Sequence, residues 1–200
     1  HSGVLSTRSG RCNCSGGTTP WGTILSGEEN FHHYFVADPK AVGSDRYGLT
    51  KHPSVYGWET IDPRFDATQS DYAAEPHRFG YIIEVDPYHP KSTPRKHTAL
   101  GRFKHEAANI RIGADGTIAV YMGDDERFEY LYKFVARKKY RPGNSASARR
   151  HNLQLLTAGD LYLARFSGTQ RPGNDNLGQG AWIPLTRNGE SAVPGMTRKC

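Results

Sequence analysis

The chain has 200 residues, of which 36% are hydrophobic and 23% charged, and its formal net charge is +6 at pH 7. This composition belongs to a globular chain that is long enough to bury one core, and it excludes an intrinsically disordered protein. No run of about 18 apolar residues occurs, so the sequence offers no transmembrane helix. The chain begins at His1 and shows no signal-peptide pattern, so we expect a processed or trimmed start.

Short apolar or alternating runs between turn residues dominate the pattern, whereas helical periodicity is nearly absent. In chain order we predict strands at residues 21–25, 79–85, 98–103, 109–112, 117–122, 130–135, 161–166 and 182–185. The two runs 109–112 and 117–122 are separated by Ala114-Asp115-Gly116, which predicts a hairpin turn of the Asp-Gly type. The residues after the first run, Glu28 and Glu29, are expected at the end of its strand.

Seven or eight strands without helices predict an all-β fold, and two architectures, a sandwich and a propeller, fit this pattern. The order of the hairpins resembles successive propeller blades, although the expected period of about 40–45 residues is only loosely visible. We expect long irregular loops at 38–77 and 140–153, placed at the functional face, and residues 55–59 offer one further short strand. Residues 1–200 are therefore predicted to form a single all-β domain or a part of one propeller domain.

Basic residues cluster at 137–141 and 149–151. Such a cluster beside Gly, Asn and Ser is typical of a solvated loop, and the alternative is attraction of phosphorylated substrates or nucleic acid. The sequence contains no recognisable nucleic-acid-binding module, which argues against a specific nucleic-acid partner.

The three cysteines are Cys12, Cys14 and Cys200. Cys12 and Cys14 are too close in sequence for an easy unstrained disulfide with each other. A disulfide between Cys12 and Cys200 would leave Cys14 free, which suits a ligand role.

Acidic residues follow several of the predicted strands, and the strongest hypothesis about the chemistry of this chain rests on them. They are Glu28, Glu29, Glu106 and Asp124, and Cys14 lies before them in a Gly-rich segment that we expect to form a turn. Carboxylates that converge at one rim of a sheet repel each other, and bound cations remove this cost. Carboxylates suit calcium and a thiolate suits a transition metal, so both together predict a mixed metal cluster. Taken singly, each pair of acids is more typical of a solvated turn, and a lone cysteine of a small buried side chain.

Four segments of the chain, in the same order, resemble the motifs of the PhoX alkaline phosphatases. They are residues 13–23 together with 28–30, then 78–87, 99–106 and 121–134, and the matches run over most of residues 12–185.

The resemblance implies a six-bladed β-propeller that carries ferric iron (Fe3+) and calcium (Ca2+) in its central channel. The family's cysteine, which bridges two irons, falls on Cys14, and two glutamates that hold iron and calcium fall on Glu29 and Glu106. These three are the predicted catalytic residues. Glu28 and Asp124 are nearby acids that we add as further candidate metal ligands.

The resemblance also implies hydrolysis of phosphomonoesters at alkaline pH, with inorganic phosphate as product. Arg102 and Lys104 are candidate phosphate-binding residues, because alternation along the predicted strand would place them on the same side as Glu106. Proteins of this family are exported, folded and metal-loaded, by the twin-arginine route, so a periplasmic or secreted location is expected.

Two features depart from the family pattern: PhoX chains are several times longer, and their later Arg-Pro-Glu motif does not occur here. We therefore expect a fragment, a cleavage product or a shortened relative, with a second chain as one way to complete the propeller. The alternatives to a phosphomonoesterase are a non-catalytic propeller fragment or anion-binding module, and a hydrolase of another ester such as a phosphotriester or lactone.

Overall fold

The computed structural model describes residues 13–41, 43–168 and 178–195. Within these ranges antiparallel sheets dominate, as the sequence predicted. No helix among the described residues is long and apolar enough to cross a membrane. Cys12 and Cys200, between which the sequence allows a disulfide, lie outside the described residues.

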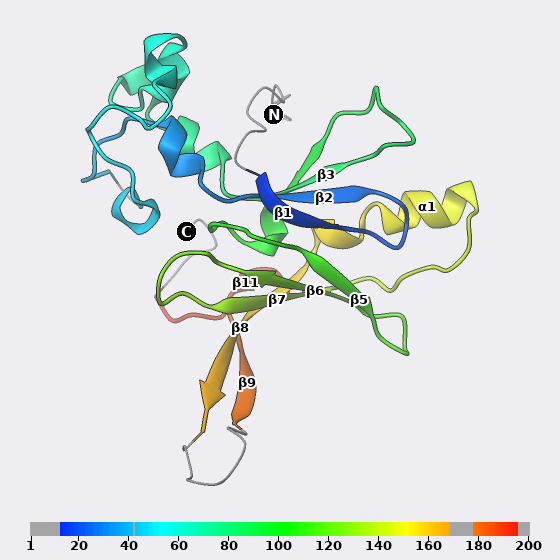
Figure 1. The fold of residues 1–200 in the computed structure, drawn as a ribbon. Coiled ribbons are helices and arrows are strands. Elements are labelled where there is room, and N and C mark those ends of the chain that lie inside the picture. The colour runs from blue at the N-terminus through cyan, green and yellow to red at the C-terminus, as the bar shows by residue number, and fades with distance from the viewer. Residues whose placement is uncertain (1–12, 42, 169–177, 196–200) are drawn as a thin grey trace, which may run out of the picture.

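Two antiparallel sheets are built from strands that follow one another in the chain (Figure 1). The first contains β1 (Asn13–Thr18), β2 (Ile24–Glu28), β3 (Ile82–Val85) and β4 (Arg95–His97). The second contains β5 (Asn109–Ile112), β6 (Ile118–Gly123), β7 (Leu131–Ala136), β8 (Gly159–Ser167) and β9 (Gln179–Pro184). Two short strands, β10 (Thr186–Arg187) and β11 (Glu190–Ser191), pair separately.

The second sheet forms where apolar and polar residues alternate. In β6 the side chains of Ile118, Val120 and Met122 are buried and the residues between them are not, which is the pattern of a half-buried strand. β7 repeats the pattern and pairs Phe134 with Val120. The predicted hairpin of residues 109–122 is confirmed, because β5 and β6 pair in register from Ile112↔Ile118 to Asn109↔Tyr121.

A single apolar core joins the two sheets. Its members from the first sheet include Leu25 and Ile82, and those from the second sheet include Val120 and Phe134, all buried. A second cluster lies in the segment 31–79, which packs aromatic side chains such as Phe31 and Phe35 against Phe79. Figure 1 shows this segment at one end of the sheets and α1 (Ala146–Asn152) at the other.

Several sequence predictions of secondary structure are wrong or shifted. In place of the predicted strand 98–103, Thr98–Leu100 form a 3-10 turn, and Gly101 follows with a φ of 90° that is incompatible with a continuous strand. β2 begins at Ile24 rather than at residue 21, and the predicted turn around Cys14 is the strand β1. The prediction of no helices is also wrong: besides α1, the described residues form 3-10 helices at Phe31–Tyr34, Asp45–Tyr47, Trp58–Thr60, Pro63–Phe65, Ser70–Tyr72, Glu75–Arg78, Thr98–Leu100 and Leu155–Thr157.

Two glycines allow the first sheet to approach the segment that enters the second sheet. A Cβ atom on Gly17 would lie 2.2 Å from the carbonyl oxygen of Ala108, and one on Gly27 would lie 2.4 Å from that of His105. Only glycine fits such contacts with backbone. The segment 105–108 is therefore held directly against β1 and β2, which places Glu106 beside the end of β2.

Candidate metal centre

Three segments that are distant in sequence meet at the end of β2. In the pairing of β1 with β2, Asn13 lies opposite Glu28, so Cys14 and Glu29 come to the same end of the sheet. The residues after β6 approach the same place, because Asp125 donates its backbone N–H to the carbonyl oxygen of Lys104 (3.0 Å). The backbone N–H of Glu106 in turn donates to Gly123 (3.3 Å).

Cys14, Glu29 and Asp125 form the centre of this arrangement. The Cys14 thiol donates a hydrogen bond to the Glu29 carboxylate, and this bond with its negative charge raises the pKa of Cys14 to about 11. The charges of Glu106 and Asp125 act on the thiol in the same direction. Burial and a hydrogen bond with Asp125 raise the pKa of Glu29, whose Oε1 also accepts from Asn30 Nδ2 at 2.8 Å.

The donor types of this centre fit the metals that the sequence predicts. One thiol and three carboxyl groups combine a ligand for a transition metal with ligands for calcium. The negative charges of Glu29, Glu106 and Asp125 contribute to the raised pKa of Cys14, and a bound cation would neutralise them. Among the described residues, however, no three His, Cys, Asp or Glu side chains are already gathered closely enough to hold a metal ion. The described side chains of the centre therefore have donor types that suit a transition metal and calcium, but they are not arranged as a complete set of ligands around one ion.

The two neighbouring acids Glu28 and Glu29 have different surroundings. Glu28 is buried and accepts hydrogen bonds from Lys96 Nζ at 2.7 and 3.0 Å and from the backbone N–H groups of Gly80 and Tyr81. Through these four hydrogen bonds, the Glu28 carboxylate is bound by groups of the protein itself. A ligand role for Glu28 stays a prediction, and its geometry favours a structural ion pair.

Asp124 is similarly engaged, and the adjacent Asp125 takes the place that we expected for it. The Asp124 side chain is 0% exposed, with Arg46 Nη2 at 2.9 Å from one oxygen and the Glu126 backbone N–H at 3.1 Å from the other. The metal-ligand role of Asp124 stays a prediction. The run Gly123-Asp124-Asp125 signalled an acid here, but the sequence did not tell which of the two aspartates faces Glu29.

The two candidate phosphate ligands do not share a strand face, because the strand that would have aligned them is absent. Arg102 donates to the carbonyl oxygens of Phe79 and Pro76, both at 2.8 Å, and its guanidinium lies 4.0 Å from the ring centroid of Tyr47. Lys104 Nζ forms an ion pair with Glu126. The prediction that Arg102, Lys104 and Glu106 align by strand alternation is therefore wrong, and phosphate binding by either cation stays a prediction.

The comparisons with known proteins identify the family. A sequence model described as alkaline phosphatase PhoX matches residues 5–199. The chain belongs to the PhoX family. Among solved structures, Pseudomonas fluorescens PhoX in complex with vanadate, a transition state analogue, is 44% identical, with a TM-score of 0.75. The match covers 87% of this chain and 30% of that one, so the chain spans about a third of the relative's length. A search of curated proteins found no match.

Two histidines of this PhoX-family chain lie close to the centre and were not singled out from the sequence. The rings of His32 and His33 lie 4.0 Å apart, in the 3-10 helix that follows Glu29 and Asn30. Burial, with the positive charges of Lys104 and His33, lowers the pKa of His32 to about 4. The pair is therefore neutral at alkaline pH. Their position directly after the Glu28-Glu29-Asn30 motif was the available signal.

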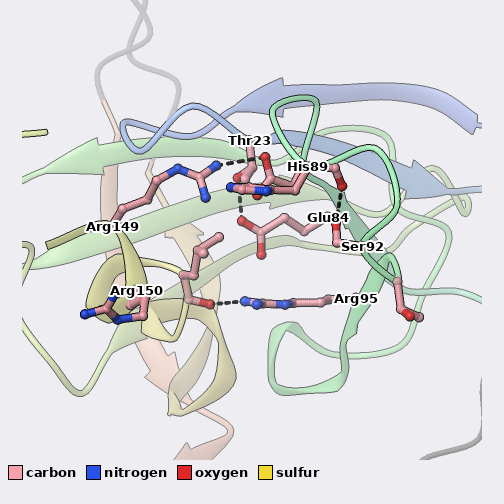
Figure 2. A pocket seen from close by; sticks show the side chains of 10 residues that line it. Thr23, Glu84, His89, Ser92, Arg95, Arg149 and Arg150 are labelled. Carbon is pink, nitrogen blue, oxygen red and sulfur yellow. Dashed lines mark hydrogen bonds and ion pairs between the residues drawn. The ribbon is translucent and has the colours of Figure 1, made fainter. Parts of the chain in front are cut away.

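A hollow of about 350 Å³ lies at the opposite end of β2, about 20 Å from Glu29 along the strand. Figure 2 shows Arg95 and Arg149 at this hollow, with Glu84 between them. Arg149 pairs with Asp86 at 2.8 Å, and Arg95 donates to the carbonyl oxygen of Leu153 at 2.7 Å. Arg149 and Arg95 are thus bound by neighbouring protein groups. We therefore interpret the hollow as the place where α1 packs against the β3–β4 loop.

Proposed function

We propose that this protein takes part in metal-dependent hydrolysis of phosphomonoesters. The observation that carries the proposal is the 44% identity to a PhoX whose structure was solved with vanadate, a transition state analogue. The centre around Cys14 supports it, because its donors are those that such a reaction requires. The activity, substrates and partners of the whole protein are inferred, since the chain corresponds to 30% of that relative.

The proposed metal ligands are Cys14, Glu29 and Glu106, joined by Asp125. The thiolate of Cys14 suits iron, and the carboxylates suit both iron and calcium. When bound, such ions hold the phosphoryl oxygens, neutralise the charge that develops on them and supply an activated oxygen nucleophile. The protein's part is to keep the thiol and carboxyl groups at one sheet end, which the close contacts of Gly17 and Gly27 achieve.

For the phosphate itself, Lys104 is the better placed of the two proposed cations. Its backbone carbonyl binds Asp125 and its side chain pairs with Glu126, so it lies against the segment that contributes to the centre. Arg102 is enclosed by carbonyl oxygens and aromatic rings. We therefore expect substitution of Lys104 to affect substrate binding more than substitution of Arg102.

The larger architecture and location are also part of the proposal. We infer that the two meandering sheets are parts of blades of a six-bladed propeller, and that the remaining ligands come from further sequence or from a second chain. We infer a periplasmic or secreted location from the family resemblance alone.

The proposal is tested on purified protein expressed with iron and calcium. Metal content by mass spectrometry and turnover of p-nitrophenyl phosphate at alkaline pH are measured before and after chelation. We expect bound iron and calcium, and loss of turnover that returns when both metals are restored. Metal-free protein without turnover after such expression would contradict the proposal for this chain.

A second candidate, a non-catalytic anion-binding module, is favoured by one observation: the described residues contain no ready-made group of three metal ligands. Calorimetric titration with inorganic phosphate separates the two. Binding of phosphate without turnover supports the module, whereas robust turnover excludes it.

A further inference from the structure

The loop that joins β6 to β7 displays an aromatic side chain under strain. Phe128 is 99% exposed, although phenylalanine is among the residues most often buried. Its φ of 67° lies in the left-handed region, where a bulky residue is a genuine outlier. Such conformations cost about 1–3 kcal/mol and persist where the surroundings impose them. Neither burial nor local backbone preference explains this residue.

Acidic residues on both sides of Phe128 are held by cations. Arg46 Nη2 binds Asp124 at 2.9 Å and Glu129 at 3.1 Å, and thereby joins the two ends of the loop. Lys104 holds Glu126 in an ion pair. Ion pairs therefore hold the loop on both sides of Phe128, and the Phe128 ring itself is exposed to solvent.

The same loop contributes to the candidate metal centre. Asp125, three positions before Phe128, shares a hydrogen bond with Glu29. The neighbouring Arg127 is exposed as well, so a cationic and an aromatic side chain follow Asp125 in the same loop. A phosphomonoester that places its phosphoryl group at the centre must extend its organic group outward, past the side chains of the rim.

We propose that Phe128 contacts the organic leaving group of the substrate and gives this protein a preference for aromatic or apolar phosphomonoesters over small polar ones. This inference rests on the proposed function. Ring–ring contacts of this kind contribute about 0.5–1.5 kcal/mol, which corresponds to roughly a 2- to 12-fold preference. No covalent role is involved, so Phe128 acts on specificity alone.

The test compares Phe128→Ala with the unchanged metal-loaded protein on two substrates, p-nitrophenyl phosphate and glycerol 3-phosphate. We expect kcat/KM for the aromatic substrate to fall about 3- to 10-fold, and kcat/KM for glycerol 3-phosphate to stay within twofold. Phe128→Trp should retain the preference. Phe166→Ala serves as the matched control, since Phe166 is also exposed, at 73%, but lies in β8 outside this loop.

Two outcomes overturn the inference. Equal loss of activity on both substrates with a lowered Tm would show that Phe128 packs against another part of the protein. Unchanged kinetics on both substrates would show that it touches no leaving group. A protein that turns over neither substrate before mutation fails the proposed function instead, so the two failures are distinguishable.

Discussion

Replacement of Gly27 by alanine tests how the fold places the candidate metal centre. Gly27 lies in β2 opposite Ile82, and its Cα faces the backbone of His105. The added Cβ would lie 2.4 Å from the His105 carbonyl oxygen, whereas ordinary contact begins at 3.4 Å. The segment 105–106 and β2 must therefore separate by about 1 Å.

The cost of this separation follows from core overpacking, which typically destabilises by about 1–3 kcal/mol. Alanine recovers about 0.4–1 kcal/mol by restricting the unfolded chain, so we expect a net loss of about 1–2 kcal/mol. Because Glu29 follows β2 and Glu106 follows His105, the same shift should weaken metal binding. Urea unfolding of the metal-free protein and metal titration of the folded protein measure the two effects.

The matched control is Gly180→Ala, a strand glycine in β9 whose added Cβ would meet nothing closer than 3.4 Å. We expect the unfolding free energy of this variant to stay within about 0.5 kcal/mol of the unchanged protein. If Gly27→Ala behaves like this control in both assays, the inferred close contact between β2 and residue 105 does not position the centre.

Two further predictions concern titratable side chains that are at least partly buried. His32 has a folded pKa of about 4, below its ordinary 6.5, so its neutral form is stabilising above pH 6.5 and this contribution declines as the pH falls towards 4. Unfolding should become easier by about 1–2 kcal/mol between pH 7 and pH 5, and a His32→Gln variant that keeps the full pH dependence would contradict this reasoning. Glu28→Gln leaves Lys96 without its buried partner, so we expect a loss of about 3 kcal/mol in urea unfolding with unchanged metal content. Loss of metal would instead favour the ligand role.

The sequence predicted those strands whose alternation is strong. β6 and β7 lie within a residue or two of their predicted bounds, because Ile118, Val120 and Phe134 must face one core. The run 98–103 shows the limit of the same reasoning. It is apolar enough for a strand, but Gly101 has a positive φ, and a Cβ there would meet the side chains of Phe103 and Leu161, a tertiary contact that no local pattern reveals.

Other elements left weaker signals. α1 could have been recognised from Ser145, whose Oγ accepts from the Ala148 N–H as an N-cap, and from the basic residues of its last turn. The segment 38–77 has no period at all. Its 3-10 turns are fixed by aromatic packing, such as that of Tyr47 beneath Arg102, which no local pattern reveals.

In the candidate site, too, some residues could be predicted from sequence motifs, whereas others depend on contacts between distant parts of the chain. The family motifs pointed to Cys14, Glu29 and Glu106, and the structure brings these chain segments to one end of β2. The choice between neighbouring acids depended on tertiary contacts. Asp124 meets Arg46 while Asp125 meets Glu29, and a side-by-side pair gives no sign of this in sequence.

The most direct test of the account is a paired measurement of metal content and p-nitrophenyl phosphate turnover in the unchanged protein and in Cys14→Ser. Serine preserves the size of the side chain and its hydrogen bond to Glu29, but it removes the thiolate that suits iron. We predict that Cys14→Ser folds with an unchanged Tm in the absence of metal, binds no iron and has lost its turnover. Retention of iron together with turnover in this variant would contradict the assignment of the metal centre.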